Sequence, residues 1–179
     1  MVKYATDTIN AIKVIESKYK IETGHIYLQG GSMGGGVVLK VASEERGIRS
    51  VIAVSPYLGA NFLANWYLAN QQSAILNTKA VYAELTYIYG PFNPNKPIYQ
   101  RESIDYKEIQ APTFLVQGTG DQRVQWQAVQ AFHDDMKADH KQVELDLVKH
   151  ANHGFTGSYD LYLHDAVTLW YAKYGEGTP

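Results

Sequence analysis

The chemistry of this chain is expected around one serine, Ser32, which stands in the spacing Gly30-x-Ser32-x-Gly34. An apolar run precedes this serine and a run suited to a helix follows it. That is the setting of a nucleophile elbow, a sharp strand-to-helix turn that exposes the serine hydroxyl above a sheet. We expect Gly30, Gly34 and Gly35 to stand where a Cβ atom would clash in so tight a turn. At the start of the following helix, the free N–H of Met33 is placed to stabilise an oxyanion.

A glycine-rich strand-to-helix turn has two other uses. It can cradle a phosphate, but no Lys-Ser/Thr pair follows these glycines as in a P-loop, and no G-x-G-x-x-G begins at them. It can also be no more than a flexible turn. The strand before Ser32 and the helix after it, which the motif requires, favour catalysis.

The elements that must hold this turn follow from hydrophobic spacing. Apolar residues at helical spacing predict helices over 4–20, 33–45, 124–140 and 159–174. Short apolar or alternating runs predict strands over 25–29, 48–55, 113–117 and 143–148. Between the second and third strands lie two helical pieces, 61–70 and 73–89, and a turn-rich loop, 90–97. The alternation predicts a three-layer α/β/α domain with a mostly parallel sheet.

Three of the predicted strands end in loops that carry candidate reactive side chains. Ser32 follows the first strand, Asp121 the third and His153 the fourth. Because parallel strands bring these loops to one edge of the sheet, the three side chains are expected to lie near one another. Their chain order, Ser then Asp then His, is the order found in α/β-hydrolases.

Four stretches of the chain carry a family resemblance: 19–35 around the serine, 99–118 through the third strand, Asp121-Gln-Arg-Val124, and His153-Gly-Phe155. In this order and spacing they resemble the C-terminal part of the prolyl-oligopeptidase-like esterases and peptidases of the α/β-hydrolase superfamily. The resemblance implies that Ser32 is the nucleophile, that His153 is the general base and acid, and that Asp121 orients the imidazole. A serine hydroxyl needs such a base because it is a poor nucleophile at neutral pH.

Other candidate side chains are few. His150 lies close to His153 in the sequence, but His153 has the Gly-Phe context of the family and is preferred. Asp105, Asp134 and Asp135 are expected to be solvated surface carboxylates. No two histidines have the His-Glu-x-x-His spacing, so no metal site is predicted.

Composition indicates one ordinary globular domain. The chain has 179 residues, of which 45% are hydrophobic and 19% charged. A net charge of −2 without a basic block gives no reason to expect nucleic acid as a partner. The apolar runs are too short to span a bilayer and the first residues lack a signal-peptide pattern, so no membrane partner and a cytoplasmic location are expected. We expect residues 1–179 to form a single domain, in which 57–98 is a lid or a helical insertion.

The strands that precede the serine in a complete α/β-hydrolase have no counterpart here, so a truncated form of that fold is expected. One of their loops supplies the second oxyanion donor, and the strand before Ser32 would lie at a sheet edge. We therefore expect a homodimer or a partner chain that completes the sheet. Catalysis should be weak unless that partner, or a side chain such as Tyr57, supplies the missing donor. The alternative is that the sequence is a fragment of a longer protein.

The expected activity is hydrolysis of small-molecule carboxylic esters through an acyl-enzyme on Ser32, without a cofactor. An ester is favoured because an alkoxide leaves more easily than an amine, which suits an incomplete site. Tyr57 and Trp126 are expected to wall the acyl pocket. Two alternatives are a serine peptidase, which the same resemblance covers, and a non-catalytic relic that serves as a binding or assembly module.

Overall fold

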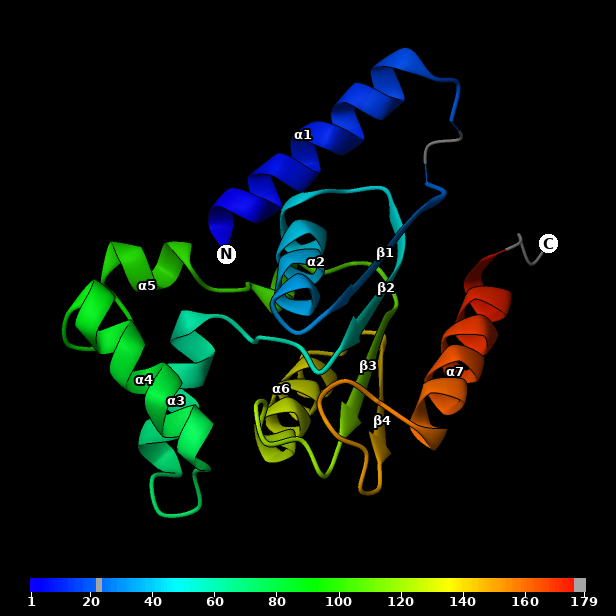
Figure 1. Cartoon of the computed structure of the whole chain (residues 1–179). Helices are drawn as coiled ribbons and strands as arrows, with labels where there is room; N and C mark the ends of the chain where they lie inside the picture. Colours follow the sequence, from blue (N-terminus) through cyan, green and yellow to red (C-terminus); the bar gives the residue numbers. More distant parts are fainter. Residues whose placement is uncertain (22–23, 176–179) are drawn as a thin grey trace.

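The computed structural model describes residues 1–21 and 24–175 (Figure 1). Its centre is a sheet of four parallel strands in the order β1-β2-β3-β4. The strands are Ile26–Gly31 (β1), Ile48–Val54 (β2), Thr113–Gly118 (β3) and Val143–Val148 (β4). The predicted α/β class and the parallel sheet are confirmed.

The helices agree with the predicted ones to within a few residues. Those that the spacing predicts are Val2–Lys18 (α1), Met33–Glu44 (α2), Ala60–Ala69 (α3), Leu76–Tyr89 (α4), Trp126–Ala138 (α6) and Ser158–Gly175 (α7). Two further elements were not predicted, the helix Pro97–Arg101 (α5) and the 3₁₀ turn Tyr106–Glu108 (η1). Both are too short for a helical period to show in the sequence.

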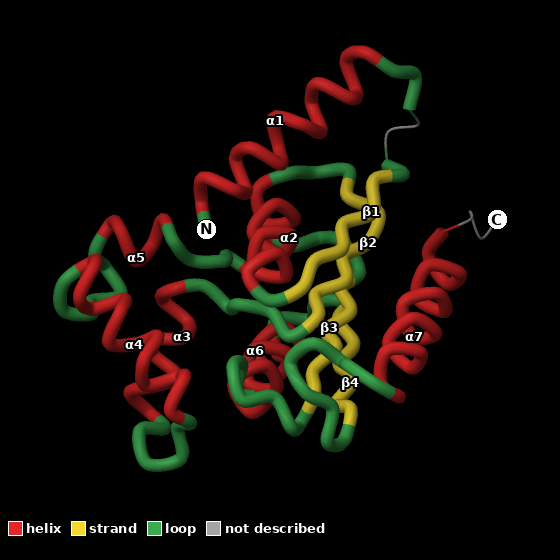
Figure 2. Tube along the Cα trace, viewed as in Figure 1, coloured by secondary structure: helices red, strands yellow, loops and turns green. Residues whose placement is uncertain are grey.

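The helices form a layer on each face of the sheet (Figures 1 and 2). α2 and α6 connect neighbouring strands, and right-handed crossovers that advance in one direction place both helices on the same face. α1 packs on α2 in that layer. α7 follows the last strand and covers the opposite face. The result is the predicted three-layer α/β/α arrangement.

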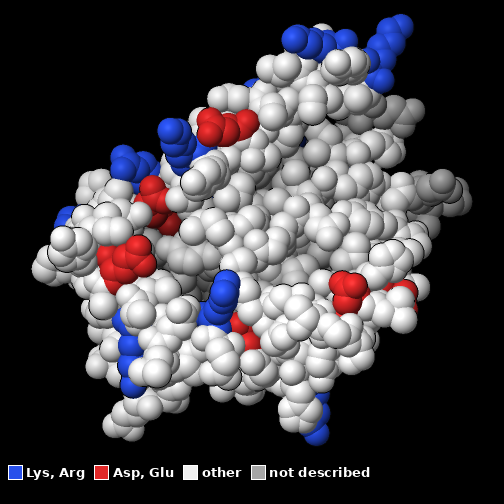
Figure 3. All heavy atoms as spheres, in the orientation of Figure 1, with Lys and Arg blue, Asp and Glu red and all other residues white. Residues whose placement is uncertain are grey.

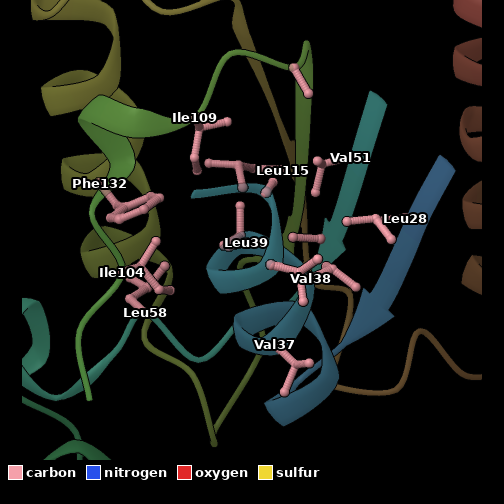
Figure 4. Packing of buried hydrophobic residues seen from close by; sticks show 14 of the residues in the cluster. Leu28, Val37, Val38, Leu39, Val51, Leu58, Ile104, Ile109, Leu115 and Phe132 are labelled. Atoms are coloured by element: carbon pink, nitrogen blue, oxygen red, sulfur yellow. The ribbon is translucent and has the colours of Figure 1, made fainter. Parts of the chain in front are cut away.

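Side chains of the central strands alternate between two cores. In β2, Val51 and Ala53 lie in the core between the sheet, α2 and α6, which Figure 4 shows. Ile52 and Val54 lie in the second core, where Trp170 of α7 is buried. Successive strand residues point to opposite faces. Because both faces are covered, residues 51–54 of the strand are all apolar instead of alternating with polar residues.

The glycines around Ser32 differ in what surrounds them. A Cβ atom on Gly30 would lie 2.3 Å from the Gly34 carbonyl oxygen, and one on Gly35 would lie 3.0 Å from Pro56 Cβ. These two glycines have the close neighbours that the sequence predicts. The expectation for Gly34 is wrong, because its Cβ position faces open space: apart from its chain neighbours and the backbone of its own helix, no atom of the described residues lies within 4 Å.

This difference gives a matched pair of variants. Gly30→Ala should destabilise the fold, because the added methyl meets a backbone carbonyl, and overpacking of this kind costs roughly 1–3 kcal/mol. Gly34→Ala should be neutral or slightly stabilising, because glycine in a helix costs about 1 kcal/mol relative to alanine. Urea unfolding of both variants beside the wild type measures the difference. Equal midpoints for the two variants would contradict the close approach of β1 and α2.

Residues 57–98 form helices beside the sheet (Figure 2). α3, α4 and α5 enclose a small apolar cluster of their own, built on Ala60, Ala64, Leu85 and Tyr99. The interpretation of this segment as a lid or an insertion stays a prediction.

The sheet has β1 at one edge and β4 at the other. Within the described residues, β1 pairs only with β2. The pairing of this edge with a second chain stays a prediction. On the face shown in Figure 3, acidic and basic side chains are scattered, with uncharged surface between them. In the part of the chain that the structure describes, no helix has both the length and the apolar character needed to cross a membrane.

Candidate active site

Ser32 occupies the turn between β1 and α2 in a strained conformation. Its φ of 53° and ψ of −119° form a combination that residues other than glycine seldom adopt. The Ser32 N–H donates to the Val54 carbonyl at 2.8 Å, and the Ser32 carbonyl accepts from the Tyr57 N–H at 2.9 Å. The end of β2 and the loop that follows it therefore hold both backbone groups of the serine. Met33, the next residue, is the first of α2, where a helix leaves N–H groups without an intrahelical partner.

Asp121 lies just after β3 and is almost fully buried. Its Oδ1 accepts from the N–H groups of Arg123, at 2.7 Å, and Val124, at 3.0 Å. Its Oδ2 accepts from Gln117 Nε2 at 3.0 Å. Burial acts to raise the pKa of Asp121, but these hydrogen bonds, with one from His153, outweigh it and hold the pKa below its ordinary value. At neutral pH the side chain is an ionised carboxylate in a fixed orientation.

His153 lies in the loop after β4 and contacts that carboxylate. Its Nδ1 is 2.8 Å from Asp121 Oδ2, so Nδ1 carries the proton and Nε2 is left as an acceptor. His153 and Ser32 line the same hollow in the surface. Among the described residues, the Ser32 hydroxyl and the His153 ring share no hydrogen bond. Catalytic bonds of this kind often tighten only in the complex with substrate. The structure thus joins Asp121 to His153 and brings His153 to the neighbourhood of Ser32.

His150 is directed elsewhere. Its backbone has a φ of 64°, its N–H donates to Thr119 Oγ1 at 2.9 Å, and the residue is exposed. The structure places His153, and not His150, against Asp121. Over residues 1–21 and 24–175, no group of three or more histidine, aspartate or glutamate side chains is arranged to hold a metal ion.

A second hollow begins at Ser32 and extends toward α3 and α4. Together with the open solvent at its mouth, it has a volume of about 760 Å³. The wall is largely apolar and includes Met33, Pro56, Leu63, Val81, Val124 and Ala128. Tyr57 lies in this wall beside Ser32. Burial, with Tyr89 and Glu102 nearby, raises the pKa of Tyr57, so its hydroxyl stays a neutral hydrogen-bond donor.

Trp126 is placed differently. It begins α6 and is half-buried, but it is not among the residues that line the hollow beside Ser32. Gln125 and Ala128 line it instead. Each residue turns the helix by about 100°, so Trp126 and Ala128, two residues apart in α6, point to nearly opposite sides of the helix. Its role in an acyl pocket stays a prediction that this geometry does not support.

Two buried glutamines position the site, and neither was predicted. Gln117 is fully buried at the end of β3, and its Nε2 donates to Asp121 as well as to two backbone carbonyls. Gln125 binds the start of α4. The sequence carries a signal for Gln117, which is a polar residue in an otherwise apolar strand. It carries none for Gln125.

Comparison with known proteins identifies the family. The sequence model that describes the prolyl oligopeptidase family matches residues 2–178 of this chain. The chain belongs to the prolyl oligopeptidase family. The resemblance drawn from its motifs is confirmed. A search of curated proteins found no match.

Solved structures similar to this prolyl oligopeptidase family member include both peptidases and esterases. The acylaminoacyl peptidase of Pyrococcus horikoshii has a TM-score of 0.77 at 15% identity and aligns over 98% of this chain and 28% of its own. An acetyl xylan esterase from Paenibacillus sp. R4 has a TM-score of 0.71 at 18% identity, over 95% of this chain and 52% of its own. A Pyrococcus furiosus esterase has a TM-score of 0.65 at 20% identity, and the alignment covers 95% of this chain and 61% of the esterase chain. These likenesses show the α/β-hydrolase fold, and the chain spans 28% to 61% of the lengths of these three proteins.

Proposed function

We propose that this chain is a serine hydrolase that cleaves small-molecule carboxylic esters through an acyl-enzyme on Ser32. The observation that carries the proposal is the 2.8 Å hydrogen bond between His153 Nδ1 and Asp121 Oδ2, beside a strained serine that shares a hollow with His153. Membership of a family with esterase and peptidase neighbours supports it.

The reaction begins as Ser32 Oγ attacks the ester carbonyl and gives its proton to His153 Nε2. Asp121 stabilises the imidazolium through the Nδ1 hydrogen bond. The Met33 N–H, at the positive end of α2, binds the oxyanion. His153 then returns the proton to the departing alkoxide. A water molecule then gives a proton to the same nitrogen and attacks the acyl carbon. The bond from that carbon to Ser32 Oγ breaks, the acid leaves, and Nε2 returns the proton to Ser32 Oγ.

A second oxyanion donor is needed for a full rate, because the loss of one donor typically costs about 100 to 1000-fold in turnover. Tyr57 lines the hollow beside Ser32, and its raised pKa keeps its hydroxyl protonated. We propose Tyr57, or a chain that pairs with the outer edge of β1 as a homodimer or hetero-partner, as the source of this donor. A site with one strong donor favours esters over amides, since the alkoxide is the better leaving group.

Hydrolysis of p-nitrophenyl butyrate, measured beside a dipeptidyl p-nitroanilide, tests the proposed substrate class. We expect clear turnover of the ester and little of the anilide, and the mass in solution should be recorded on the same sample. Faster hydrolysis of the anilide would favour peptidase activity instead. A lack of turnover on both would favour a non-catalytic binding module, and a monomeric mass would contradict the proposed pairing of β1 in a homodimer.

A further inference from the structure

The side chain of Gln125 joins two parts of the chain that meet at the site. Gln125 is 4% exposed and lies four residues after Asp121, at the start of α6. Its Oε1 accepts from the Ile75 N–H at 3.0 Å and from Thr78 Oγ1 at 3.2 Å. Its Nε2 donates to the Ser73 carbonyl at 3.0 Å. The oxygen and the nitrogen of the Gln125 amide therefore both bind residues 73–78, which include the first turn of α4.

A second polar bond lies beside this one. Asn77, in the first turn of α4, donates from Nδ2 to the Arg123 carbonyl at 2.7 Å. The N–H of Arg123 in turn donates to Asp121 Oδ1. The short segment 121–125 thus carries the acid of the site and also fastens α4.

The two ends of α4 are held by different forces. Toward its C-terminus, Leu85 is buried with α3 and α5 in their apolar cluster, and Tyr82 stacks on Tyr67 with ring centroids 4.3 Å apart. At its N-terminus, Leu76 is 84% exposed. The first turn is held by the polar bonds from Gln125 and Asn77. Removing the Gln125 bonds should therefore loosen the first turn and leave the packed half of the helix in place.

That first turn forms part of the wall beside Ser32. Asn77, Thr78 and Val81 line the same hollow as Ser32 and Met33. The position of the turn therefore sets the space available to a group bound to Ser32.

We propose that Gln125 is a specificity-determining residue: it holds the first turn of α4 against the segment that carries Asp121 and so limits the length of the acyl group that the hollow accepts. This inference rests on the proposed ester hydrolysis at Ser32. A hydrophobic pocket discriminates between acyl groups that differ by one methylene by roughly 10 to 200-fold, so a small displacement of its wall changes the preference measurably.

Gln125→Ala, assayed on p-nitrophenyl acetate, butyrate and octanoate, tests the inference. The ratio of kcat/KM for octanoate to that for butyrate should rise about tenfold in the variant. A merely structural role would lower both values together and leave this ratio unchanged, because loss of folded enzyme affects every substrate alike. Gln127→Ala is the matched control, since Gln127 is the exposed glutamine two residues further along α6. Its ratio should equal that of the wild type.

Hydrogen exchange gives a readout that does not depend on activity. In Gln125→Ala the amides of residues 79–82 should exchange faster, whereas those of 85–89 should not change. If this variant does not fold, Gln125→Glu replaces it, because the glutamate keeps an oxygen for the Ile75 and Thr78 donors and loses the donor to Ser73. Wild-type ester turnover with an unchanged octanoate-to-butyrate ratio in the variant overturns this inference alone. A wild type without turnover overturns the proposed function and this inference with it.

Discussion

Ser32→Ala should lower kcat on p-nitrophenyl butyrate by a factor on the order of 10⁵ without unfolding the protein. Without the hydroxyl no acyl-enzyme forms, and only the binding site and the oxyanion donor remain. The fold should persist because the backbone groups of residue 32 still bond Val54 and Tyr57. Alanine also meets the φ of 53° with no more strain than serine does.

Steady-state kinetics and covalent labelling together check this result. An organophosphonate fluoride should add one adduct to the wild type, on the peptide that contains Ser32, and none to the variant. Ser17→Ala is the control, since Ser17 is exposed on α1 and its hydroxyl bonds only the Val14 carbonyl among the described residues. Turnover in Ser32→Ala within tenfold of the wild type would place the nucleophile elsewhere.

Asp121→Asn should lower kcat by about 10⁴-fold. In the wild type, the N–H groups of Arg123 and Val124 donate to Asp121 Oδ1. In the variant, these two donors need the amide oxygen of the asparagine. The amide NH₂ then faces His153 Nδ1, which must accept instead of donate. That moves the ring proton to Nε2, where it prevents the imidazole from accepting the proton of the serine. Reversing the amide would set its NH₂ against two N–H donors, so neither orientation restores the base.

Kinetics at neutral pH measure the loss of kcat, with Asp7→Asn, a change at an exposed acid on α1, as the control.

The stability of the same proteins should depend on pH in a defined direction. The folded pKa of Asp121 lies below its ordinary value of about 3.9. Between the two values the unfolded chain binds more protons, so the free energy of unfolding of the wild type rises with pH. The stabilisation from the carboxylate is fully present above about pH 4 and is lost as the pH falls through the lower, folded value.

Asp121→Asn lacks this titration. The gap in melting temperature between wild type and variant should therefore be largest above about pH 4 and narrow toward pH 2. Thermal unfolding across that range checks the direction. A gap that does not change with pH would show that the Asp121 hydrogen bonds do not favour the carboxylate.

Much of the framework was predictable because its signals are local. The continuous apolar run in β2 predicts a buried strand, and the helical spacing of apolar residues in α6 predicts a helix. Both signals depend only on residues that are close together in the sequence. The Gly-x-Ser-x-Gly spacing indicates the sharp turn between β1 and α2 in the same way, because such a turn limits the side chains within it. The chain order of Ser32, Asp121 and His153, read against parallel strands, was sufficient to expect them at one edge of the sheet.

The sequence by itself therefore determined the elements, their order and the candidate side chains for the site. Tertiary structure alone decided which contacts these residues make. His150 and His153 are three positions apart in the sequence, and the course of the backbone between them places only His153 against Asp121. Gln125 reaches Ser73 and Thr78 across about fifty residues of chain. Such contacts depend on how segments far apart in the sequence pack against each other. The residue spacing within one segment carries no information on the position of the other.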